Sequence, residues 1–441
     1  MRNVYLSFLG TNRYLRCIYT HPDILDPRPT RYVQEATLRL YDSSRNRCSA
    51  EDVAYFFLTE EARHCNWEQG EDPENQEPCE GLESRVRTLG GTYEMRTIDI
   101  PKGENEEELW KIFDCVFGVI EEEDRITFDV THAFRSIPMF ALVILAYARA
   151  LKRVHIEHVY YGAFETLGTL SQAKAKPLEQ RKAPIFDLTS FVYLLDWTVA
   201  VDRFLKAGDP SSIAALTQNK ILPRLRAAKG KDPAARDLRH ISQRLEEFGA
   251  NLSTCRSMRI GPVARDLART LDRLQAADVV KPFEPLLDLL KKDLDRFDGQ
   301  DVVRDGMQAT KWCLEHNLIQ QGYTILQETV LTHFLCKAGE QGPYRRDIRE
   351  TAGQAFKIAR SKLEPREWKP PACDYPELVK EMVQEISKNS GIQAIMDKLS
   401  AKRNDLNHAG TTEDSIRDAS QFGRELRTLV GEVEKALFEK N

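Results

Sequence analysis

The sequence lacks the glycine-rich signatures with which many α/β proteins bind nucleotides. Neither G-x-G-x-x-G nor G-x-x-x-x-G-K-[ST] occurs in its 441 residues, so the chain has neither a dinucleotide fingerprint nor a P-loop. Its nine cysteines are scattered and form no C-x-x-C. This pattern argues against a disulfide framework or a zinc site and favours reduced thiols. We therefore expect a cytoplasmic protein without a metal ion or an enzyme cofactor.

Long apolar runs and a strong net charge are also absent. The longest apolar stretch, near Met139–Tyr147, is shorter than the roughly 18 residues of a membrane span. The first residues lack the apolar core and cleavage site of a signal peptide, so we expect no membrane association. The net charge of −5 predicts no general affinity for nucleic acid. The basic segment Lys220–Arg244 is either a local RNA contact or a solvated helix face.

The first 187 residues alternate between strand and helix patterns. Strands are predicted at Val4–Leu9, Val53–Thr59, Tyr93–Ile100, Arg125–Val130, His155–Tyr161 and Pro184–Leu188. Helices are predicted at Glu106–Ile120, at Pro138–Ala150 and near Thr30–Leu40. This alternation indicates a mostly parallel sheet with helices on both faces. The acidic, aperiodic stretch Asn66–Gly81 is predicted to be an exposed loop.

Strand patterns stop after Asp187, and segments with helical periodicity follow to the end of the chain. They begin with the strongly apolar Phe191–Leu205 and include Gln308–Lys337, Gly391–His408 and Thr412–Phe438. We therefore expect everything beyond residue 187 to be all-α.

Two predicted strand-to-helix turns carry residues suited to a ligand. One strand ends in Asp-Val-Thr-His and leads into an apolar helix, and Arg135 there adds a fixed cation to the hydrogen-bonding ring of His132. The first strand ends similarly, in Gly10-Thr11-Asn12-Arg13-Tyr14. Main-chain N–H groups at a helix start favour anions, and ligands of open α/β sheets lie beyond the carboxyl ends of strands. The two turns are expected to line one crevice, unless they are polar turns that bind nothing.

The pattern R-x-x-x-x-H occurs three times, at Arg16–His21, Arg153–His158 and Arg403–His408. The first two matches have extended or strand contexts, so the spacing alone is weak evidence for a catalytic site. Only Arg403–His408 falls on a predicted helix. There Asn404 and His408 are i,i+4 neighbours, as are Arg403 and Asn407.

This third match has the groups that metal-free RNA cleavage requires. An imidazole can transfer protons to and from the 2′-OH, and a guanidinium can stabilise the charge on the phosphorane. Gly410 is expected to end the helix and Thr412 to cap the next one. The alternative is a capped helix end whose polar side chains are merely solvated.

Together these motifs resemble the CARF–HEPN ribonucleases of type III CRISPR systems. The resemblance rests on F-L-G-T-N-x-Y at Phe8–Tyr14, L-T-E-E-A-x-x-x-N-W at Leu58–Trp67, D-V-T-H-A-F-R-S-I-P at Asp129–Pro138, P-I-F-D-L-T at Pro184–Thr189, W-C-L-E-H-N-L-I-Q-Q-G-Y-T-I-L-Q-E at Trp312–Glu328 and R-N-D-L-N-H at Arg403–His408. The chain departs from the family at Ala133, where the CARF turn often has glycine.

The resemblance implies a Rossmann-like CARF domain over residues 1–187, a helical intermediate region over 188–300 and an all-α HEPN domain over 301–441. The CARF domain would bind cyclic oligoadenylate as an allosteric activator, with tetra-adenylate favoured over hexa-adenylate. The implied activator-binding residues are Gly10, Thr11, Asn12, Tyr14, Thr131, His132 and Arg135.

The HEPN domain would be a metal-independent endoribonuclease on single-stranded RNA, with 2′-OH attack giving 2′,3′-cyclic phosphates. Its implied catalytic residues are Arg403, Asn404 and His408. A symmetric activator implies a homodimer, or a higher oligomer of dimers, in which two chains complete each site.

Three other functions stay open. The protein is alternatively a non-enzymatic cyclic-nucleotide sensor that regulates DNA or a partner through its helical half. The CARF domain would alternatively also degrade its activator, because Thr131 and His132 can act on a 2′-OH. An α/β enzyme acting on a small molecule is disfavoured, because the first 187 residues contain no acid/base pair or cofactor motif.

Overall fold

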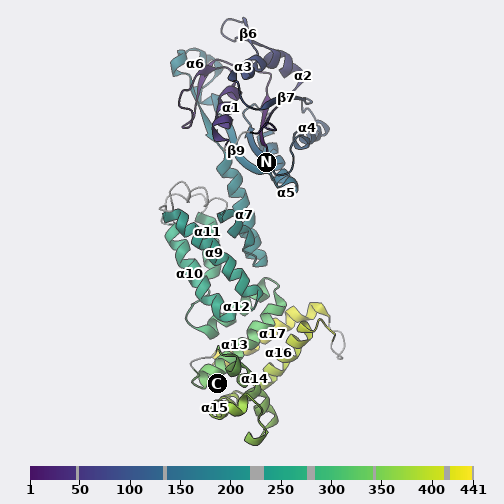
Figure 1. Cartoon of the computed structure of the whole chain (residues 1–441), viewed down its shortest axis with the longest axis vertical. Coiled ribbons are helices and arrows are strands. Elements are labelled where there is room, and N and C mark those ends of the chain that lie inside the picture. Colours follow the sequence, from purple (N-terminus) through teal and green to yellow (C-terminus); the bar gives the residue numbers. More distant parts are fainter. Residues whose placement is uncertain are drawn as a thin grey trace. The chain divides into compact units, whose positions relative to one another are not determined.

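The chain folds into two compact units. The computed structural model describes residues 1–45, 49–132, 137–218, 233–275, 284–340, 344–411 and 418–439. Unit 1 is Met1–Tyr193 and unit 2 is Leu194–Asn441. The division falls within one helix, α7 (Thr189–Ala207), shortly after the predicted limit at residue 187 (Figure 1).

Unit 1 is built on an eight-stranded sheet with the order β3-β2-β10-β9-β8-β1-β4-β7. The strands are β1 (Asn3–Leu9), β2 (Cys17–Thr20), β3 (Pro29–Thr30), β4 (Val53–Leu58), β7 (Glu94–Asp99), β8 (Arg125–Asp129), β9 (His155–Gly162) and β10 (Lys182–Asp187). Neighbouring strands are parallel except for β9–β10 and β2–β3. The predicted mostly parallel α/β fold is therefore confirmed.

Helices cover both faces of the sheet (Figure 1). They are α1 (Val33–Ser44) and α3 (Leu82–Leu89) on one face and α4 (Glu106–Gly118) and α5 (Ile137–Lys152) on the other. Successive residues of a strand point to opposite faces. In β1, Leu6 accordingly joins the core under α4 and α5, whereas Tyr5 joins the core under α1 and α3.

The prediction that Asn66–Gly81 is an exposed loop is wrong for its first residues, which are helical and buried. The short α2 (Glu60–Ala62) continues into a π-helical turn, η1 (Arg63–Glu68), and a hairpin follows, made of β5 (Gln69–Glu71) and β6 (Pro78–Glu80). Asn66 and Trp67 are each 3% exposed, and the Trp67 ring lies 4.9 Å from that of Phe56. The acidic composition belongs to the hairpin, whereas the residues before it are anchored in the core.

Short helices η2 (Phe164–Leu167), α6 (Leu170–Lys174) and η3 (Leu178–Gln180) complete unit 1.

The described part of unit 2 contains helices and no strand, which confirms the predicted all-α region. Residues 211–218, which follow α7, are helical. The further helices are α9 (Pro233–Ser253), α10 (Ser257–Gln275), α11 (Glu284–Leu294), α12 (Val302–Glu315), α13 (Ile319–Lys337), α14 (Arg346–Ser361), α15 (Pro376–Lys388), α16 (Ile392–Asn407) and α17 (Ala419–Phe438). Two short helical turns, η5 (Pro365–Glu367) and η6 (Ala372–Asp374), lie between α14 and α15. Much of the basic segment Lys220–Arg244 lies outside the described residues.

Two helix limits differ from the sequence analysis. The predicted single segment Gln308–Lys337 breaks between α12 and α13, where Asn317 has a left-handed φ of 58°. The cap of α17 is Asp418, whose side chain accepts a hydrogen bond from the Ser420 N–H. Thr412, the predicted cap, lies outside the described residues.

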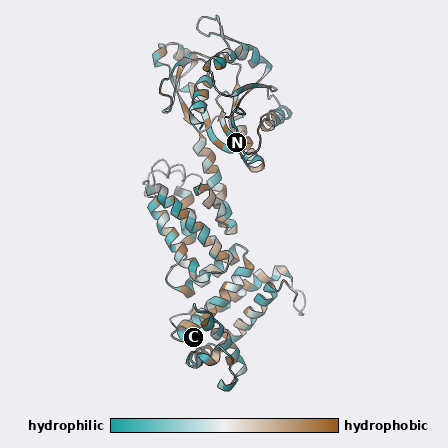
Figure 2. Ribbon diagram, in the orientation of Figure 1, coloured by the Kyte–Doolittle hydropathy of each residue, from teal (hydrophilic) through white to brown (hydrophobic). Residues whose placement is uncertain are grey.

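The described residues of unit 2 form two hydrophobic cores that share helices. Trp312 of α12 belongs to the core formed with α7, α9, α10 and α11, whereas Met307 of the same helix belongs to the core formed with α13 to α17. Figure 2 shows hydrophobic and hydrophilic residues alternating along these helices, as expected for helices with one buried face. Among the described helices of the whole chain, none combines the length and apolarity that a membrane span requires.

Candidate functional site

The two predicted ligand turns lie side by side at the carboxyl ends of two central strands of the sheet. Strands β1 and β8 are adjacent and parallel, with Ser7 opposite Asp129, so the turns that follow them leave the sheet together. The cavity between them has a volume of about 310 Å³. Its lining includes Gly10, Thr11, Asn12, Tyr14, Thr131 and His132. Six of the seven predicted activator-binding residues thus line one cavity, and Arg135 lies outside the described residues.

A second cavity, of about 550 Å³, adjoins the first. The two share Asn12, Tyr14, Thr131 and His132, and the second also has Tyr161 and Phe164 in its wall. The rings of Tyr14 and His132 lie 4.3 Å apart. Aromatic walls beside polar main chain suit a ligand that has both bases and phosphates.

A hydrogen bond between Gly10 and Tyr14 closes the first turn. The Gly10 N–H donates to the Tyr14 hydroxyl at 3.0 Å. A Cβ at position 10 would lie 2.7 Å from that oxygen, so a larger residue there would have to displace the Tyr14 hydroxyl. Burial raises the pKa of Tyr14, which keeps the phenol neutral.

His132 contributes an imidazole with spare hydrogen-bonding capacity. Burial lowers the pKa of His132 to about 4, so the ring is neutral at pH 7. Its Nε2 is buried and has no hydrogen-bond partner in the described part of the chain. A buried polar atom without a partner is costly, and a ligand in either cavity would remove that cost.

Asp129 fixes the second turn from below. The carboxylate is fully buried. It accepts hydrogen bonds from the Thr131 N–H at 3.1 Å, from the Thr131 hydroxyl at 2.6 Å and from the Ser7 hydroxyl at 3.0 Å. Burial raises the pKa of Asp129 although these hydrogen bonds lower it. The Thr131 oxygen in turn accepts from the Gly162 N–H of β9 at 2.8 Å, so Asp129 and β9 together hold Thr131 at the cavity.

The same arrangement recurs at the end of β10, which the sequence analysis did not predict. There the Thr189 N–H donates to Asp187 at 2.9 Å, and the Thr189 hydroxyl donates to the same carboxylate oxygen. The Thr189 oxygen accepts from the Val159 N–H of β9 at 2.8 Å. The sequence signal that could have revealed this second arrangement is the recurrence of Asp-x-Thr at the ends of two strands. Neither Asp187 nor Thr189 lines the two cavities.

Asn66 is a further residue that the sequence analysis missed as part of this site. Its side-chain amide donates to the Gly10 carbonyl at 2.8 Å and to the Asn12 carbonyl at 3.0 Å. The buried η1 turn therefore holds the first ligand turn in place. The only sequence signal was the Asn-Trp pair within the motif at Leu58–Trp67.

Substituting Asn66→Ala is expected to loosen this turn. Two carbonyls lose their donor, and each hydrogen bond contributes about 0.5–1.5 kcal/mol, so we expect lower stability and an activator affinity about tenfold weaker. Chemical denaturation and calorimetry with cyclic tetra-adenylate measure both effects. Asn75→Ala is the matched control, because Asn75 is exposed and its described hydrogen bonds go only to its near neighbour Glu77. Equal affinities of the two variants would contradict a role of Asn66 in shaping the site.

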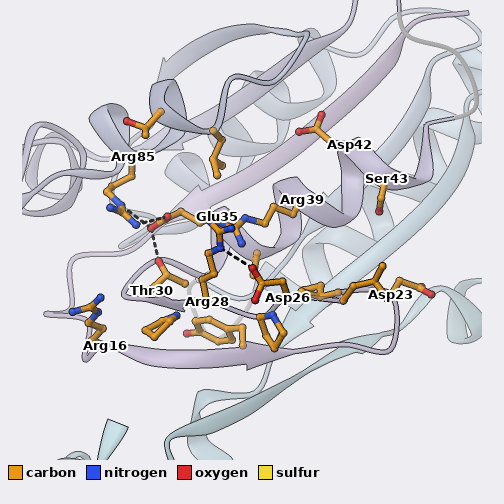
Figure 3. Close-up of a pocket in the computed structure, with 18 residues that line it drawn as sticks. Arg16, Asp23, Asp26, Arg28, Thr30, Glu35, Arg39, Asp42, Ser43 and Arg85 are labelled. Carbon is orange, nitrogen blue, oxygen red and sulfur yellow. Dashed lines mark hydrogen bonds and ion pairs between the residues drawn. The ribbon is translucent and has the colours of Figure 1, made fainter. Parts of the chain in front are cut away.

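The largest of these cavities, about 770 Å³, lies elsewhere in unit 1, along α1 and α3 (Figure 3). In it Glu35 accepts from Thr30 and Arg85, and Arg28 pairs with Asp26 at 3.0 Å (Figure 3). None of the predicted site residues lines it.

The predicted catalytic residues lie at the end of α16. The helix ends at Asn407 with His408 as its C-cap, and the Gly410 N–H donates to the Asp405 carbonyl at 3.0 Å. Gly410 was the predicted stop, but Ala409, with φ 53°, is the first left-handed residue, followed by Gly410 with φ 70°. The His408 side chain is exposed, and its imidazole has no hydrogen bond within the described residues.

Arg403 is half-buried and has a neutral partner. Its Nη1 donates to Gln327 Oε1 of α13 at 3.4 Å, and its Nε is buried without a partner in the described structure. Asn404 is exposed. The predicted pairing within the motif does not form as side-chain bonds: Asn404 accepts the His408 N–H through its main chain, at 2.9 Å, and Asn407 bonds Gln320 instead.

Arg403 and His408 do not form a joined pair within one chain. Five residues along an α-helix rotate the side-chain direction by roughly 140°, and no described hydrogen bond connects the two side chains. Among the residues that the structure describes, no three His, Cys, Asp or Glu side chains gather as metal ligands do. Among the residues described, the helix end therefore offers one guanidinium without an ion pair and one accessible imidazole per chain.

Comparisons with known proteins give one relative in sequence. No protein-family profile matches the chain. A stretch of 124 residues is 31% identical to CRISPR-associated protein MJ1674 of Methanocaldococcus jannaschii, and this stretch makes up 27% of the chain and 18% of that relative. The predicted resemblance to CRISPR-associated proteins is confirmed over that stretch. Among solved structures, Enterococcus italicus Csm6 bound to cyclic hexa-2′-fluoro-hexa-dAMP is similar over 99% of this chain and 95% of its own, with 10% identity and a TM-score of 0.45.

Proposed function

We propose that this protein is a CARF–HEPN ribonuclease of type III CRISPR defence, in which unit 1 binds cyclic oligoadenylate and unit 2 cleaves single-stranded RNA. The observation that carries the proposal is the end of α16, where a guanidinium that forms no ion pair in the described structure and an accessible imidazole share one short segment. The CRISPR-associated relative supports it. The proposed division is a CARF domain over residues 1–187, an intermediate region over 188–300 and a HEPN domain over 301–441.

The paired cavities of unit 1 support cyclic oligoadenylate as the ligand, with tetra-adenylate proposed over hexa-adenylate. Phosphates would meet the main chain of Gly10–Asn12 and the side chain of Arg135, and a base or ribose would meet the free Nε2 of His132. The Thr131 hydroxyl donates to Asp129, so its proton is already engaged. This engagement disfavours Thr131 in the alternative in which Thr131 and His132 act on a 2′-OH of the activator.

The proposed cleavage uses the RNA's own 2′-OH. His408 removes the 2′ proton, the 2′ oxygen bonds to phosphorus, and the bond to the 5′ oxygen breaks as that oxygen takes up a proton. Arg403 stabilises the added negative charge on the phosphorane, and Asn404 is proposed to orient the phosphate. The products are a 2′,3′-cyclic phosphate and a 5′-OH.

A homodimer, or a higher oligomer of dimers, is proposed to complete both sites. Each chain supplies one Arg403 and one His408, which face those of a second chain across a twofold axis. An exposed apolar stripe on α5 supports association through unit 1. Its exposed residues are Leu142, Val143, Tyr147 and Leu151.

The test is cleavage of labelled single-stranded RNA by the purified protein, with and without cyclic tetra- or hexa-adenylate, in EDTA. We expect activator-dependent cleavage that persists in EDTA, because the proposed groups need no bound cation, and products that carry 2′,3′-cyclic phosphates. Activity that EDTA abolishes and Mg²⁺ restores would contradict the mechanism. Activator binding without any cleavage would favour the non-enzymatic sensor, and disappearance of the activator itself would favour the CARF domain that degrades it.

A further inference from the structure

One side of α13 faces the residues proposed for catalysis. Gln320 donates to Asn407 at 3.3 Å, and Gln327, two turns further along, contacts Arg403. Residues at this spacing share one face of a helix. The end of α16 is therefore held by glutamine side chains from a neighbouring helix.

Gln327 is positioned to orient Arg403. It is 9% exposed, and its amide nitrogen donates to the Ser400 hydroxyl at 3.2 Å while its oxygen accepts from Arg403 Nη1 at 3.4 Å. A guanidinium can only donate, so the amide oxygen must face Arg403. The single amide thus bridges two residues one turn apart on α16.

The acid next to Gln327 in sequence is already engaged. Glu328, the residue next to Gln327, accepts from Arg349 Nε at 3.1 Å, and no ion pair to Arg403 forms in the described part of the chain. Within the described residues the guanidinium is therefore held by a neutral acceptor, which orients it without an ion pair. A carboxylate at position 327 would instead form a charge-assisted hydrogen bond and neutralise it.

We propose that Gln327 is a positioning residue for RNA cleavage, which presents the positive charge of Arg403 to an RNA phosphate. This inference rests on the proposed function. According to this inference, the charge of the side chain at position 327, and not only the size of that side chain, determines how strongly the protein binds RNA phosphate.

The test compares Gln327→Glu with Gln327→Met. For Gln327→Glu we expect kcat/KM for RNA to fall about 100-fold, and the slope of log affinity against log salt to weaken by about 0.7, the value of one single-strand phosphate contact. For Gln327→Met we expect kcat to fall about tenfold, with KM and the salt slope unchanged. The slopes are measured with RNA that carries 2′-deoxy nucleotides and cannot be cleaved.

Gln384→Glu and Gln384→Met are the matched controls, because Gln384 is an exposed residue of α15 in the same unit; both are expected to behave as wild type. Thermal unfolding and activator affinity report whether each variant is folded. An unchanged salt slope in a folded Gln327→Glu protein overturns the inference, as does an equal slope change in Gln327→Met. If Gln327→Glu does not fold, full activity of Gln327→Met overturns it. A wild-type protein that binds RNA without cleaving it overturns the proposed function, whereas the salt slopes still test the Gln327 contact.

Discussion

Replacing His408 by alanine, or Arg403 by alanine, is expected to remove most RNA cleavage, by about 10²–10⁴-fold for a general acid–base group. His408 is exposed and its imidazole has no described partner, and the one described side-chain hydrogen bond of Arg403 goes to Gln327. Neither substitution therefore breaks a network on which the fold depends. We expect unchanged thermal unfolding and unchanged activator affinity, measured beside single-turnover cleavage at saturating activator.

The other two R-x-x-x-x-H matches provide the controls for this prediction. His21→Ala and His158→Ala lie in unit 1, where His158 bonds Asp187 at 3.0 Å and the ring of His21 packs edge-on against Tyr160. Both are expected to retain the cleavage chemistry. If His408→Ala or Arg403→Ala keeps more than about a third of wild-type turnover, that residue does not have the assigned role.

The sheet was predictable because its strands are buried and long enough to show a pattern. β1 and β4 are buried at every residue, and β4 is also apolar throughout, as expected for strands covered on both faces. β2 and β3 escaped prediction because β3 has only two residues and β2 pairs with β10, more than 160 residues further along the chain. Short strands depend on such distant partners more than on their own sequence.

The residues missed at the sites share one property, which is that a distant contact defines their role. Asn66 looks like part of an acidic loop, yet it bonds the carbonyls of Gly10 and Asn12, 56 and 54 residues away. Gln327 looks like an ordinary helical glutamine, yet its partner Arg403 is 76 residues away. Composition and periodicity report only local preferences, so the sequence located the proposed sites at two turns and one helix end but did not predict the side chains that hold them.

The recurrence of Asp-x-Thr at two strand ends makes Thr131→Val the most discriminating test of the activator site. Valine keeps the shape of threonine but neither donates to Asp129 nor accepts the Gly162 N–H. An unsatisfied buried group costs about 1–3 kcal/mol. Thr131 also lines both cavities, so we expect the affinity for cyclic tetra-adenylate to fall about 10–100-fold, as measured by calorimetry.

Thr189→Val removes the same pair of hydrogen bonds at the other strand end, to Asp187 and from Val159, but Thr189 lines neither cavity. The Thr189→Val variant is expected to be less stable, while its activator affinity stays within about threefold of wild type.

A ligand shifts a conformational equilibrium only through its preference for one state. Saturating activator should therefore restore cleavage in Thr131→Val, because the end of α16 is unaltered. Equal losses of affinity in the two variants would mean that both act through the stability of unit 1 and would remove Thr131 from the site. Cleavage that no activator concentration restores would instead assign Thr131 to transmission of the signal.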